Sequence, residues 1–365
     1  MNGAAKALER GSLVDFLASD GAFLGRGTYN PHTLIAGRIL TRKVTQEIDQ
    51  HYFAHQFRSA LALRQRMGLG DYCRLIHAEG DGLPGLIIDR FGPHLSVQLN
   101  SAGMDALWPS IKAALLEVLQ PAAIMLHNDS SIRSLEGLER TSSLDHGAVS
   151  SAIPVQENGL TYFADIVGGQ KTGWYFDQRD NHALVARFAK DCTVLDLYTH
   201  AGGFALLAAK CGAARVVGVD SSEPALALAR QAATHNGLDQ SCEWHKADVF
   251  EYMERLIGTR EAYDIVIADP PPFVKSRKDL AAGARGYRKL ARLSALTTKP
   301  SGLLYIASCS HNMDLARLTA EVAQGLSEAR RNGQILFTTF AATDHPVHPH
   351  LPESAYLKGL VIRLD

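Results

Sequence analysis

Short apolar runs alternate with longer amphipathic stretches from Val194 onward. The apolar runs predict strands over 194–198, 215–220, 242–248, 263–269, 302–308 and 335–341. The stretches between them predict helices, as in Glu223–His235, where Ala225 and Leu228 recur at helical spacing after a Ser-Ser-Glu-Pro start. A last apolar run over 356–364 predicts a terminal strand. This alternation is typical of a doubly wound α/β domain, which we predict over 166–365.

The first 165 residues follow a different pattern. Apolar and polar positions alternate over 12–40, and the segment SLVDFLASDGAFLGRG predicts a hairpin that turns at Ser19-Asp20-Gly21. Helices are predicted over 43–68 and 106–119, and strands over 86–89, 95–99, 122–127 and 160–166. We therefore predict a β-rich module over 1–55 and an α+β middle domain over 56–165.

The composition is that of an ordinary globular protein. The chain has 365 residues, and its 37 Lys and Arg balance 38 Asp and Glu, so net charge alone predicts no partner. The start, MNGAAKALERGSLVDF, has no secretory apolar core, and no later stretch has the roughly 18 uncharged apolar residues of a membrane span. We expect a cytoplasmic protein with no membrane segment.

The cysteines and histidines indicate neither a metal site nor a disulfide framework. The five cysteines form no CxxC pair and have no histidine at metal-ligand spacing. We expect three of them to be small buried side chains, away from the sheet edge at which the predicted parallel strands end: Cys192, Cys211 and Cys242. Three histidines gather near the end of the chain, at His345, His348 and His350. The prolines between them favour a rigid loop over a metal site.

A group of side chains at strand ends predicts a cofactor site. The run VLDLYTHAGGF is a strand that ends near Asp196 and Tyr198 and turns at Gly202 into a helix. Glycines let the backbone approach a ligand at the carboxyl edge of a sheet. Asp220 ends the next strand, where a carboxylate can accept hydrogen bonds from both hydroxyls of a ribose. Asp248, at the end of the third, is placed to meet an adenine amino group.

Each of these acids alone is also compatible with a helix N-cap or a solvated loop. NAD is the competing cofactor, because it too uses a ribose-binding acid after a glycine turn. The absence of the GxGxxG pattern and the motif on the fourth strand both disfavour NAD.

The fourth and fifth strands end in residues suited to chemistry on a base. The fourth ends in DPPPF, where consecutive prolines fix an extended loop that presents Asp269, and Phe273 can stack on a flat ring. The fifth, GLLYIASCS, brings Cys309 to the same edge of the sheet. We therefore predict that Asp269 and Cys309 face one substrate.

A thiolate near a carboxyl group suits methylation of a pyrimidine. Carbon 5 of the ring is a poor nucleophile until a thiolate adds to carbon 6, and a carboxyl group hydrogen-bonded at N3 or N4 assists that addition. Cys309 would be the nucleophile. The alternative is that Cys309 is a small buried hydrophobic side chain, as most free cysteines are.

Basic residues are concentrated beside the DPPPF loop. Between Pro271 and Pro300 the single acid Asp279 stands against eight of them: Lys275, Arg277, Lys278, Arg285, Arg288, Lys289, Arg292 and Lys299. This stretch suggests a polyanionic substrate, although a solvated helix face has the same pattern. Beside a base-stacking loop, it favours RNA or DNA. The residues predicted to bind the substrate are Pro270, Pro271, Phe273 and Lys275.

Several motifs together resemble one family. The runs KTGWYFDQR (171–179), DLYTHAGGF, DPPPF and ASCS and the ending DHPV…YLKG look like the RlmI-like class I S-adenosylmethionine-dependent 23S rRNA methyltransferases. The stretch RLIHAEGDGLPGLIIDRFG (74–92) matches too, so the resemblance covers nearly the whole chain. It implies a PUA module, a middle α+β domain and a Rossmann-like methyltransferase domain, which make 5-methylcytosine in the large ribosomal subunit.

The resemblance also implies roles for individual residues. Bound S-adenosylmethionine would contact Asp196, Gly202, Asp220 and Asp248, with Gln178 and Arg179 near its methionine end. A structural turn before the domain is the other explanation for the last two. The family assigns Cys309 as nucleophile and Asp269 as the acid that orients the base. It implies 23S rRNA as partner, and a homodimer.

The chain departs from the family pattern in three places. The family begins with an earlier β segment containing a His-Pro-Trp-like stretch, so we expect an incomplete PUA-like module here. Pro272 stands where a lysine or similar residue is usual, and His311-Asn312-Met313 follow SCS in place of Gly-Leu-Met. These departures affect the prediction of the target nucleotide more than the prediction of the reaction type.

Two other functions fit the same residues. One is an exocyclic-amine methyltransferase that uses the DPPPF loop alone, for which Cys309 is dispensable. The other is a nucleic-acid-binding protein with a degenerate, non-catalytic methyltransferase domain.

For the cytosine reaction, the target base must be unpaired or flipped, because a duplex hides carbon 5.

Overall fold

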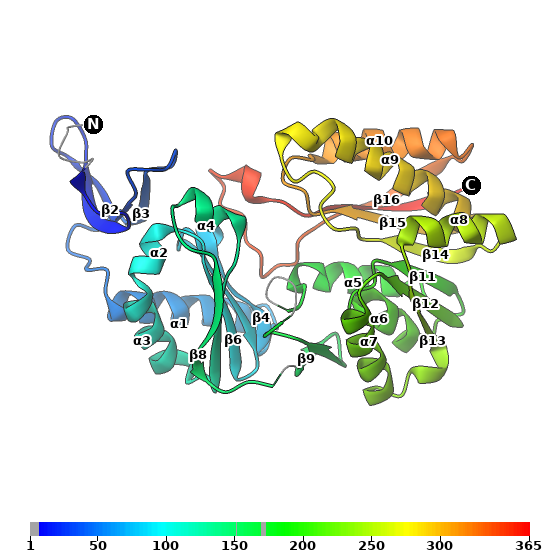
Figure 1. Cartoon of the computed structure of the whole chain (residues 1–365), viewed down its shortest axis with the longest axis horizontal. Coiled ribbons are helices and arrows are strands. Elements are labelled where there is room, and N and C mark those ends of the chain that lie inside the picture. Colours follow the sequence, from blue (N-terminus) through cyan, green and yellow to red (C-terminus); the bar gives the residue numbers. More distant parts are fainter. Residues whose placement is uncertain (1–6, 151, 169–172) are drawn as a thin grey trace. The chain divides into compact units, whose positions relative to one another are not determined.

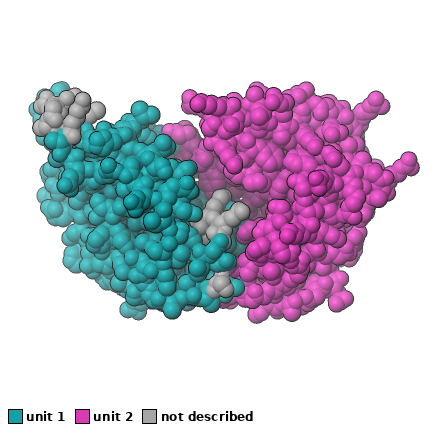
Figure 2. Space-filling view, in the orientation of Figure 1, with its two compact units in different colours: residues 1–153, 165–176, 343–351 teal, residues 154–164, 177–342, 352–365 magenta. Residues whose placement is uncertain are grey.

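The helices and strands of the computed structural model, which describes residues 7–150, 152–168 and 173–365, divide into two units. Unit 1 comprises residues 1–153, 165–176 and 343–351, and unit 2 comprises residues 154–164, 177–342 and 352–365 (Figure 1, Figure 2). The chain therefore passes between the units several times. The domain limits at residues 55 and 165 stay predictions.

Unit 1 begins with a three-stranded antiparallel sheet in the order β1-β2-β3, formed by Ser12–Leu17, Phe23–Tyr29 and Gly37–Thr41. At the first turn the amide of Ala18 donates to the carbonyl oxygen of Ala22 over 2.8 Å. Gly21 has a φ of +86°, a left-handed conformation that glycine adopts without strain. The predicted hairpin is confirmed.

A second, five-stranded sheet forms the larger part of unit 1, in the order β4-β5-β6-β7-β8. Its strands are β4 (Tyr72–His77), β5 (Leu86–Phe91), β6 (His94–Leu99), β7 (Ala123–Asn128) and β8 (Thr141–Gly147). Side chains of α1 (Gln50–Arg66) and α3 (Trp108–Leu119) share its core, where Phe53, Phe57 and Ile111 are fully buried. Two short helices, α2 (Ala102–Ala106) and α4 (Ser131–Leu135), complete this part.

Several elements of unit 1 differ from the sequence prediction, and among them β4 and α4 were not predicted at all. Helix α1 starts at Gln50 and not near residue 43, because the side chain of Asp49 caps it by accepting a hydrogen bond from the amide of Tyr52 (2.9 Å). The helix expected over 106–119 is α3, which begins at Trp108 with a proline in its first turn, and the separate short helix α2 precedes it. Strand β8 was not predicted, because its sequence TSSLDHG is mostly polar and exposed.

Unit 2 is built on a seven-stranded sheet in the order β13-β12-β11-β14-β15-β17-β16. Its strands are β11 (Thr193–Leu197), β12 (Arg215–Asp220), β13 (Cys242–Lys246), β14 (Tyr263–Ala268), β15 (Thr298–Ser308), β16 (Gly333–Phe340) and β17 (Lys358–Leu364). The first five in this order run parallel, and β17 pairs antiparallel with both β15 and β16. The predicted doubly wound α/β fold is confirmed, with this antiparallel end added.

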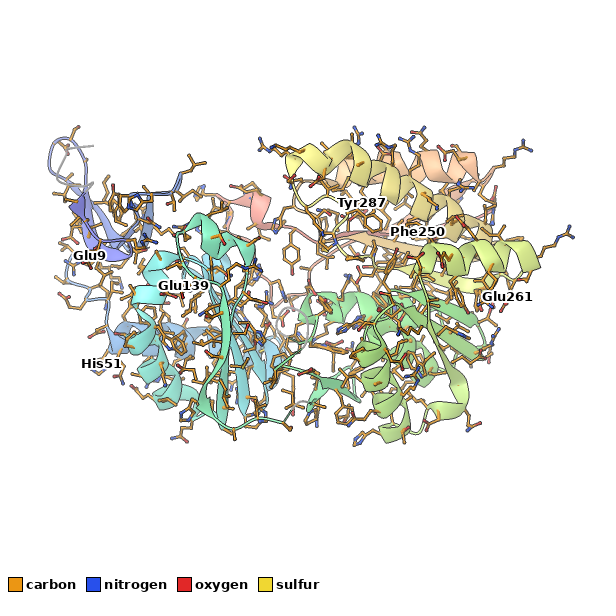
Figure 3. All side chains as sticks on the ribbon, in the orientation of Figure 1. Glu9, His51, Glu139, Phe250, Glu261 and Tyr287 are labelled. Carbon is orange, nitrogen blue, oxygen red and sulfur yellow. The ribbon has the colours of Figure 1, made fainter. Side chains whose placement is uncertain are left out.

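Helices cover both faces of this sheet. On one face lie α5 (Arg179–Ala186), α6 (Gly203–Lys210) and α7 (Glu223–His235), and on the other lie α8 (Val249–Thr259), α9 (Leu280–Thr297) and α10 (Leu315–Glu328) (Figure 1). Tyr287 of α9 is buried in the core of the second face, and Phe250 of α8 packs against that core (Figure 3). A two-stranded ribbon, β9 (Ile153–Glu157) and β10 (Leu160–Ala164), precedes the sheet. The remaining elements are the 3₁₀ turns Ala78–Asp81, Phe176–Gln178, Asp239–Ser241, Arg277–Asp279 and Pro352–Ser354.

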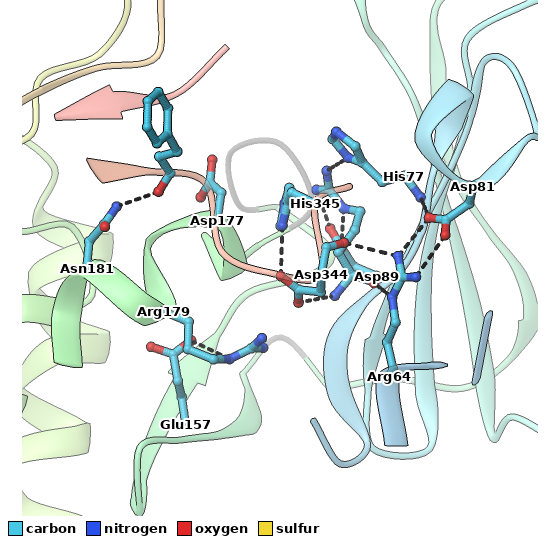
Figure 4. Close-up of polar contacts among 12 residues, drawn as sticks. Arg64, His77, Asp81, Asp89, Glu157, Asp177, Arg179, Asn181, Asp344 and His345 are labelled. Carbon is cyan, nitrogen blue, oxygen red and sulfur yellow. Dashed lines mark hydrogen bonds and ion pairs between the residues drawn. The ribbon is translucent and has the colours of Figure 1, made fainter. Parts of the chain in front are cut away.

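The segment 343–351 belongs to unit 1, although it lies between β16 and β17 in the sequence. Asp344 is fully buried there, and its Oδ2 accepts a hydrogen bond from the amide of Arg74 (2.9 Å). Its carbonyl oxygen accepts one from Arg64, whose guanidinium also binds both carboxylate oxygens of Asp81 (Figure 4). These buried charged groups are paired, as burial of charge requires.

Within the described residues, no helix combines the length and the apolar character needed to cross a membrane. In the same part of the chain, no three side chains of His, Cys, Asp or Glu are grouped as metal ligands.

Candidate active site at the carboxyl edge of the seven-stranded sheet

The sheet of unit 2 changes its winding direction beside β11. The chain passes from β11 to β12 on one side, whereas β14 and β15 follow on the other. Leu197 of β11 lies opposite both Val219 of β12 and Ala268 of β14. The residues that follow, among them Asp220 and Asp269, therefore emerge side by side at one edge. Such a switch point is where open α/β sheets bind their ligands.

The side chain of Asp196 holds the glycine turn after β11 by hydrogen bonds. This side chain is almost fully buried, and its Oδ2 accepts hydrogen bonds from Thr199 Oγ1 (2.6 Å) and from the amide of Ala205 (3.1 Å). Burial raises the pKa of Asp196 to about 7, against the opposing effect of the Thr199 hydrogen bond. Asp196 thus shapes the turn through contacts with the backbone and with Thr199.

The turn itself uses left-handed backbone conformations. Tyr198 has a φ of +62° and Gly202 a φ of +84°, and Gly202 caps the N-terminus of α6. A Cβ atom on Gly202 would come within 3.0 Å of the Trp244 ring, so a side chain there would be strained and crowded. Tyr198 packs against the core, and burial raises its pKa.

Asp220 and Asp248 are both fixed by backbone amides. In Asp220 one oxygen accepts from the amide of His200 (2.9 Å) and the other from that of Ser222 (2.8 Å). Each oxygen keeps a lone pair for a further donor, such as a ribose hydroxyl. Asp248 is exposed, and its Oδ1 caps α8 by accepting from the amides of Phe250 (2.9 Å) and Glu251 (3.1 Å). The N-cap considered in the sequence analysis is therefore present at Asp248.

The DPPPF loop follows β14 and packs on rings of α8 and α9. The ring of Phe273 lies 4.8 Å from that of Tyr287 and 6.3 Å from that of Phe250, centroid to centroid. Pro270 is buried and Pro271 is exposed. Phe273 is half-buried, so one part of its ring is used in packing and another part remains accessible. Lys275, which follows, is exposed.

Cys309 follows β15, the strand next to β14. It is half-buried and lies between Ser308 and Ser310, which are both buried. The two loops are joined directly, because the amide of Val274 donates to Ser310 Oγ over 3.2 Å. The predicted proximity of the strand ends that carry Asp269 and Cys309 is confirmed by the parallel pairing of β14 with β15.

The other cysteines of unit 2 lie apart from this edge. Cys242 is buried, and burial raises its pKa to about 12; burial also raises the pKa of the half-buried Cys192. Both fit the expected structural role. Cys211 does not, because it is exposed at the C-terminus of α6.

The basic residues of the stretch between Pro271 and Pro300 include some that form ion pairs and some that do not. Arg288 pairs with Glu321 (2.7 Å), and two lysines pair with acids of neighbouring elements, Lys289 with Glu254 and Lys299 with Asp264. Lys275, Arg277, Lys278 and Arg285 are exposed, and within the described residues none of these four pairs with an acid. We call these four residues the basic surface. It begins directly after the DPPPF loop.

Gln178 and Arg179 lie at the start of α5, with their side chains in packed contacts. Gln178 Oε1 accepts from Asn181 Nδ2 (2.6 Å) and from the hydroxyl of Tyr305 (3.1 Å). The guanidinium Nε of Arg179 lies 3.8 Å from Glu157 Oε2, and both side chains are buried (Figure 4). Lys171 and Thr172 of the same motif lie outside the described residues.

Tyr305 connects this segment to the carboxyl edge of the seven-stranded sheet. The pKa of Tyr305 is raised mainly by burial, and the negative charge of Asp269 raises it further. Gln178, Tyr305 and Asp269 therefore form one group of neighbours on α5, β15 and β14.

Sequence reasoning missed a buried pair beneath the glycine turn. His182 Nδ1 lies 2.7 Å from Glu157 Oε1, and its ring meets that of Phe204 edge-on at 4.4 Å. A Cβ atom on Gly203 would come within 2.6 Å of the His182 ring. The second glycine of the turn was the only local signal of this contact, because Glu157 lies far away in the sequence.

The residues at this edge fit a nucleoside-bearing cofactor. The glycine turn places the left-handed Gly202 at the start of α6, and the fixed carboxylate of Asp220 can still accept from two hydroxyls.

Comparison with protein families agrees with this geometry. Residues 142–363 match the family model described as S-adenosylmethionine-dependent methyltransferase, which spans more than half of the chain. The chain belongs to this methyltransferase family. Residues 1–42 match a PUA-like domain.

Curated relatives of this methyltransferase cover almost its whole length. A ribosomal RNA large subunit methyltransferase I from Shewanella denitrificans is 38% identical, over 98% of this chain and 91% of its own length. One of the same name from Tolumonas auensis is 37% identical, over 97% of this chain and 91% of its own. S-adenosylmethionine is therefore the cofactor of this methyltransferase.

Solved structures share the fold. A crystal structure described as a methyltransferase complexed with SAH superimposes with a TM-score of 0.83 at 22% identity, covering 97% of this chain and 92% of the other. A SAM-dependent methyltransferase from Streptococcus mutans gives a TM-score of 0.82 at 22% identity, with the same coverage. At this identity the likeness concerns the fold.

Proposed function

We propose that this methyltransferase transfers a methyl group from S-adenosylmethionine to carbon 5 of a cytosine in large-subunit (23S) rRNA. The observation that carries the proposal is the placement of Asp269 and Cys309 after adjacent parallel strands, in loops joined by the Val274–Ser310 hydrogen bond. The names of the curated relatives support rRNA as the substrate. We retain the homodimer as a prediction.

Cys309 would act as the nucleophile and Asp269 as the general acid. The Cys309 thiolate adds to C6 and forms an S–C6 bond, while the ring electrons move toward N3, which takes a proton from the Asp269 carboxyl group. C5 is then nucleophilic enough to take the methyl group. The N3 proton returns to Asp269, water removes the C5 proton, and the electrons of that bond restore the ring and expel the Cys309 thiolate.

S-adenosylmethionine supplies the electrophilic methyl group and leaves as S-adenosylhomocysteine. We propose that Asp220 accepts from the ribose hydroxyls, and that the exposed Asp248 and the turn at Tyr198 and Gly202 border the adenosine. Asp196 would act by holding that turn.

Gln178 and Arg179 would border the methionine part. Gln178 lies beside Tyr305, which in turn neighbours Asp269, so this placement is consistent with a donor site close to the catalytic acid.

The product identifies the reaction. Incubation with labelled S-adenosylmethionine and large-subunit rRNA, followed by nucleoside analysis, is expected to yield 5-methylcytosine. RNA with 5-fluorocytidine at the target should trap a covalent complex, because fluorine cannot leave C5 as a cation and the thiolate cannot be expelled. Mass spectrometry should place the RNA adduct on Cys309.

The competing reaction predicts a different pattern. An exocyclic-amine methyltransferase would give an N-methylated nucleoside and no complex with 5-fluorocytidine RNA. That pair of results would refute the cytosine-5 reaction while keeping the methyltransferase activity. A transcript with 5-methylcytidine at the target serves as the matched control RNA, because its target carbon is already methylated.

The basic surface is expected to bind RNA phosphates. Replacing Lys275, Arg277, Lys278 and Arg285 together with glutamine should weaken RNA binding at least about tenfold and lower the salt slope of log Kd by about three, since each phosphate contact contributes about 0.7–0.9. Fluorescence anisotropy at several salt concentrations measures both quantities. The control variant Lys289→Gln should leave both nearly unchanged, because Lys289 pairs with Glu254. An unaltered salt slope in the quadruple variant would assign these residues to a solvated helix face.

A further inference from the structure

The segment that carries Cys309 is held by hydrogen bonds on both of its sides. The hydroxyl of Tyr287 accepts from Ser308 Oγ (2.8 Å) and shares a hydrogen bond with Ser310 Oγ (3.1 Å). Lys358 Nζ donates to the carbonyl oxygen of Ser310 (2.7 Å). Cys309 therefore lies in a loop that hydrogen bonds hold in place, and Lys358 is hydrogen-bonded to the residue that follows it, Ser310.

Lys358 reaches this loop from the neighbouring strand. It is the first residue of β17 and lies opposite Ser308 in the antiparallel ladder with β15. Its side chain is buried, and Nζ also donates to the carbonyl oxygen of Tyr356 (2.7 Å). An ammonium group has three N–H donors, so these two carbonyls leave one for a further acceptor. A buried ammonium also requires a compensating negative charge.

The negative groups around Lys358 are Cys309 and Asp314. Burial lowers the pKa of Lys358 to about 8, whereas a Cys309 thiolate and Asp314, the N-cap of α10, act to raise it. Burial raises the pKa of Tyr287, and a Cys309 thiolate raises it further. Two further titratable side chains have contacts near this segment: Tyr356 donates its hydroxyl to Asp177 (2.6 Å), and His311 packs on the Tyr356 ring at 5.3 Å.

We propose that Lys358 is a positioning residue that fixes the loop of Cys309 and favours the thiolate form of Cys309 by its ammonium charge. This inference rests on the proposed role of Cys309 as nucleophile. A cation near a sulfur stabilises the thiolate, which is the reactive species. The same charge would stabilise the thiolate again when it is expelled from C6 in the last step.

The test measures the thiol directly, without RNA. The wild type, Lys358→Gln and Lys358→Met are alkylated with iodoacetamide over a range of pH, and mass spectrometry follows the Cys309 and Cys211 peptides separately. Glutamine keeps N–H donors for the two carbonyls but no charge, and methionine keeps the length but no donor. Lys358→Arg keeps the charge. Lys299→Gln, which removes an ion-paired lysine near the other end of β15, is the matched control.

We expect the midpoint of the Cys309 profile to rise by about one to three pH units in the Gln and Met variants, because an opposite charge at close range has an effect of this size. The exposed Cys211 gives the internal reference, and its profile should not move. The arginine and Lys299→Gln variants should stay within about half a unit of the wild type. In methyl-transfer assays the Gln and Met variants should lose kcat at least about tenfold, with KM for RNA nearly unchanged.

The outcomes separate this inference from the proposed function. An unmoved Cys309 profile in both neutral variants, with S-adenosylmethionine binding intact, would overturn the role of Lys358. A midpoint for Lys358→Arg as high as that of Lys358→Gln would overturn it as well, because charge would then be irrelevant. If Cys309→Ala still forms 5-methylcytosine, the nucleophile assignment fails instead, whatever the alkylation profiles show.

Discussion

Replacing Cys309 with alanine is expected to lower methyl transfer to large-subunit rRNA at least about a thousandfold, as loss of a nucleophile does in other enzymes. Without the S–C6 bond, carbon 5 of cytosine lacks the electron density to take a methyl group. The affinity for S-adenosylmethionine should stay within about twofold of the wild type, because the predicted cofactor residues lie at the ends of β11 and β12, after β13 and at the start of α5, whereas Cys309 follows β15.

Single-turnover transfer of labelled methyl groups measures the first effect, and calorimetric titration with S-adenosylmethionine measures the second. Cys211→Ala is the control, because Cys211 is exposed at the end of α6 and serves neither loop. Cofactor binding without turnover in Cys309→Ala would also separate an enzyme from a degenerate domain, which should bind the cofactor weakly even in the wild type. A Cys309→Ala protein that methylates at the wild-type rate would make Cys309 a structural residue.

The parallel part of the fold could be predicted because its signals are local. Most strands from β11 to β15 contain a short apolar run and are followed by a helix, and residues at the carboxyl ends of such strands must share one edge. This rule alone brought Asp220, Asp269 and Cys309 together. The helix Glu223–His235 was predicted with its limits correct, since Ser222 caps it and a proline follows in its first turn.

The antiparallel end of the sheet could not be predicted, because its pairing joins residues far apart in the sequence. Strand β17 inserts between β15 and β16, and no local pattern in YLKGLVIRL specifies that position. Lys358 consequently resembled an ordinary lysine of a terminal strand, although the ladder places it opposite Ser308. The expectation for Cys211 was wrong for a related reason: the type of residue does not reveal which side of a helix end is covered.

The partners of individual side chains could not be predicted from the sequence either. The basic stretch was predicted as a single feature, whereas Arg288, Lys289 and Lys299 are neutralised by acids from other elements. The predicted cofactor acids were found at the strand ends, yet Asp196 is buried and bonded to its own turn. Composition and spacing locate such groups along the chain, and only packing decides which of them remain available to a ligand.

Asp269→Asn is expected to reduce kcat for methyl transfer by about a hundredfold or more, within the range that general acid–base catalysis contributes. The amide can still donate a hydrogen bond to N3 of the base, but it has no proton to transfer. KM for RNA should therefore change little, and the loss should fall on the chemical step. Asp264→Asn is the matched control, because Asp264 stands near the start of the same strand and pairs with Lys299 (2.9 Å).

The covalent complex gives this prediction a second readout. If Asp269 protonates N3 during thiolate addition, the asparagine variant should trap 5-fluorocytidine RNA more slowly by a similar factor, since addition precedes methyl transfer. Trapping at the wild-type rate with slow methyl transfer would place the acid after the addition step. Equal losses in kcat and in RNA affinity, with normal trapping at saturating RNA, would show that Asp269 only binds the base. The carboxyl group and the thiolate are thus tested as two parts of one addition, which their neighbouring strands bring to the same edge of the sheet.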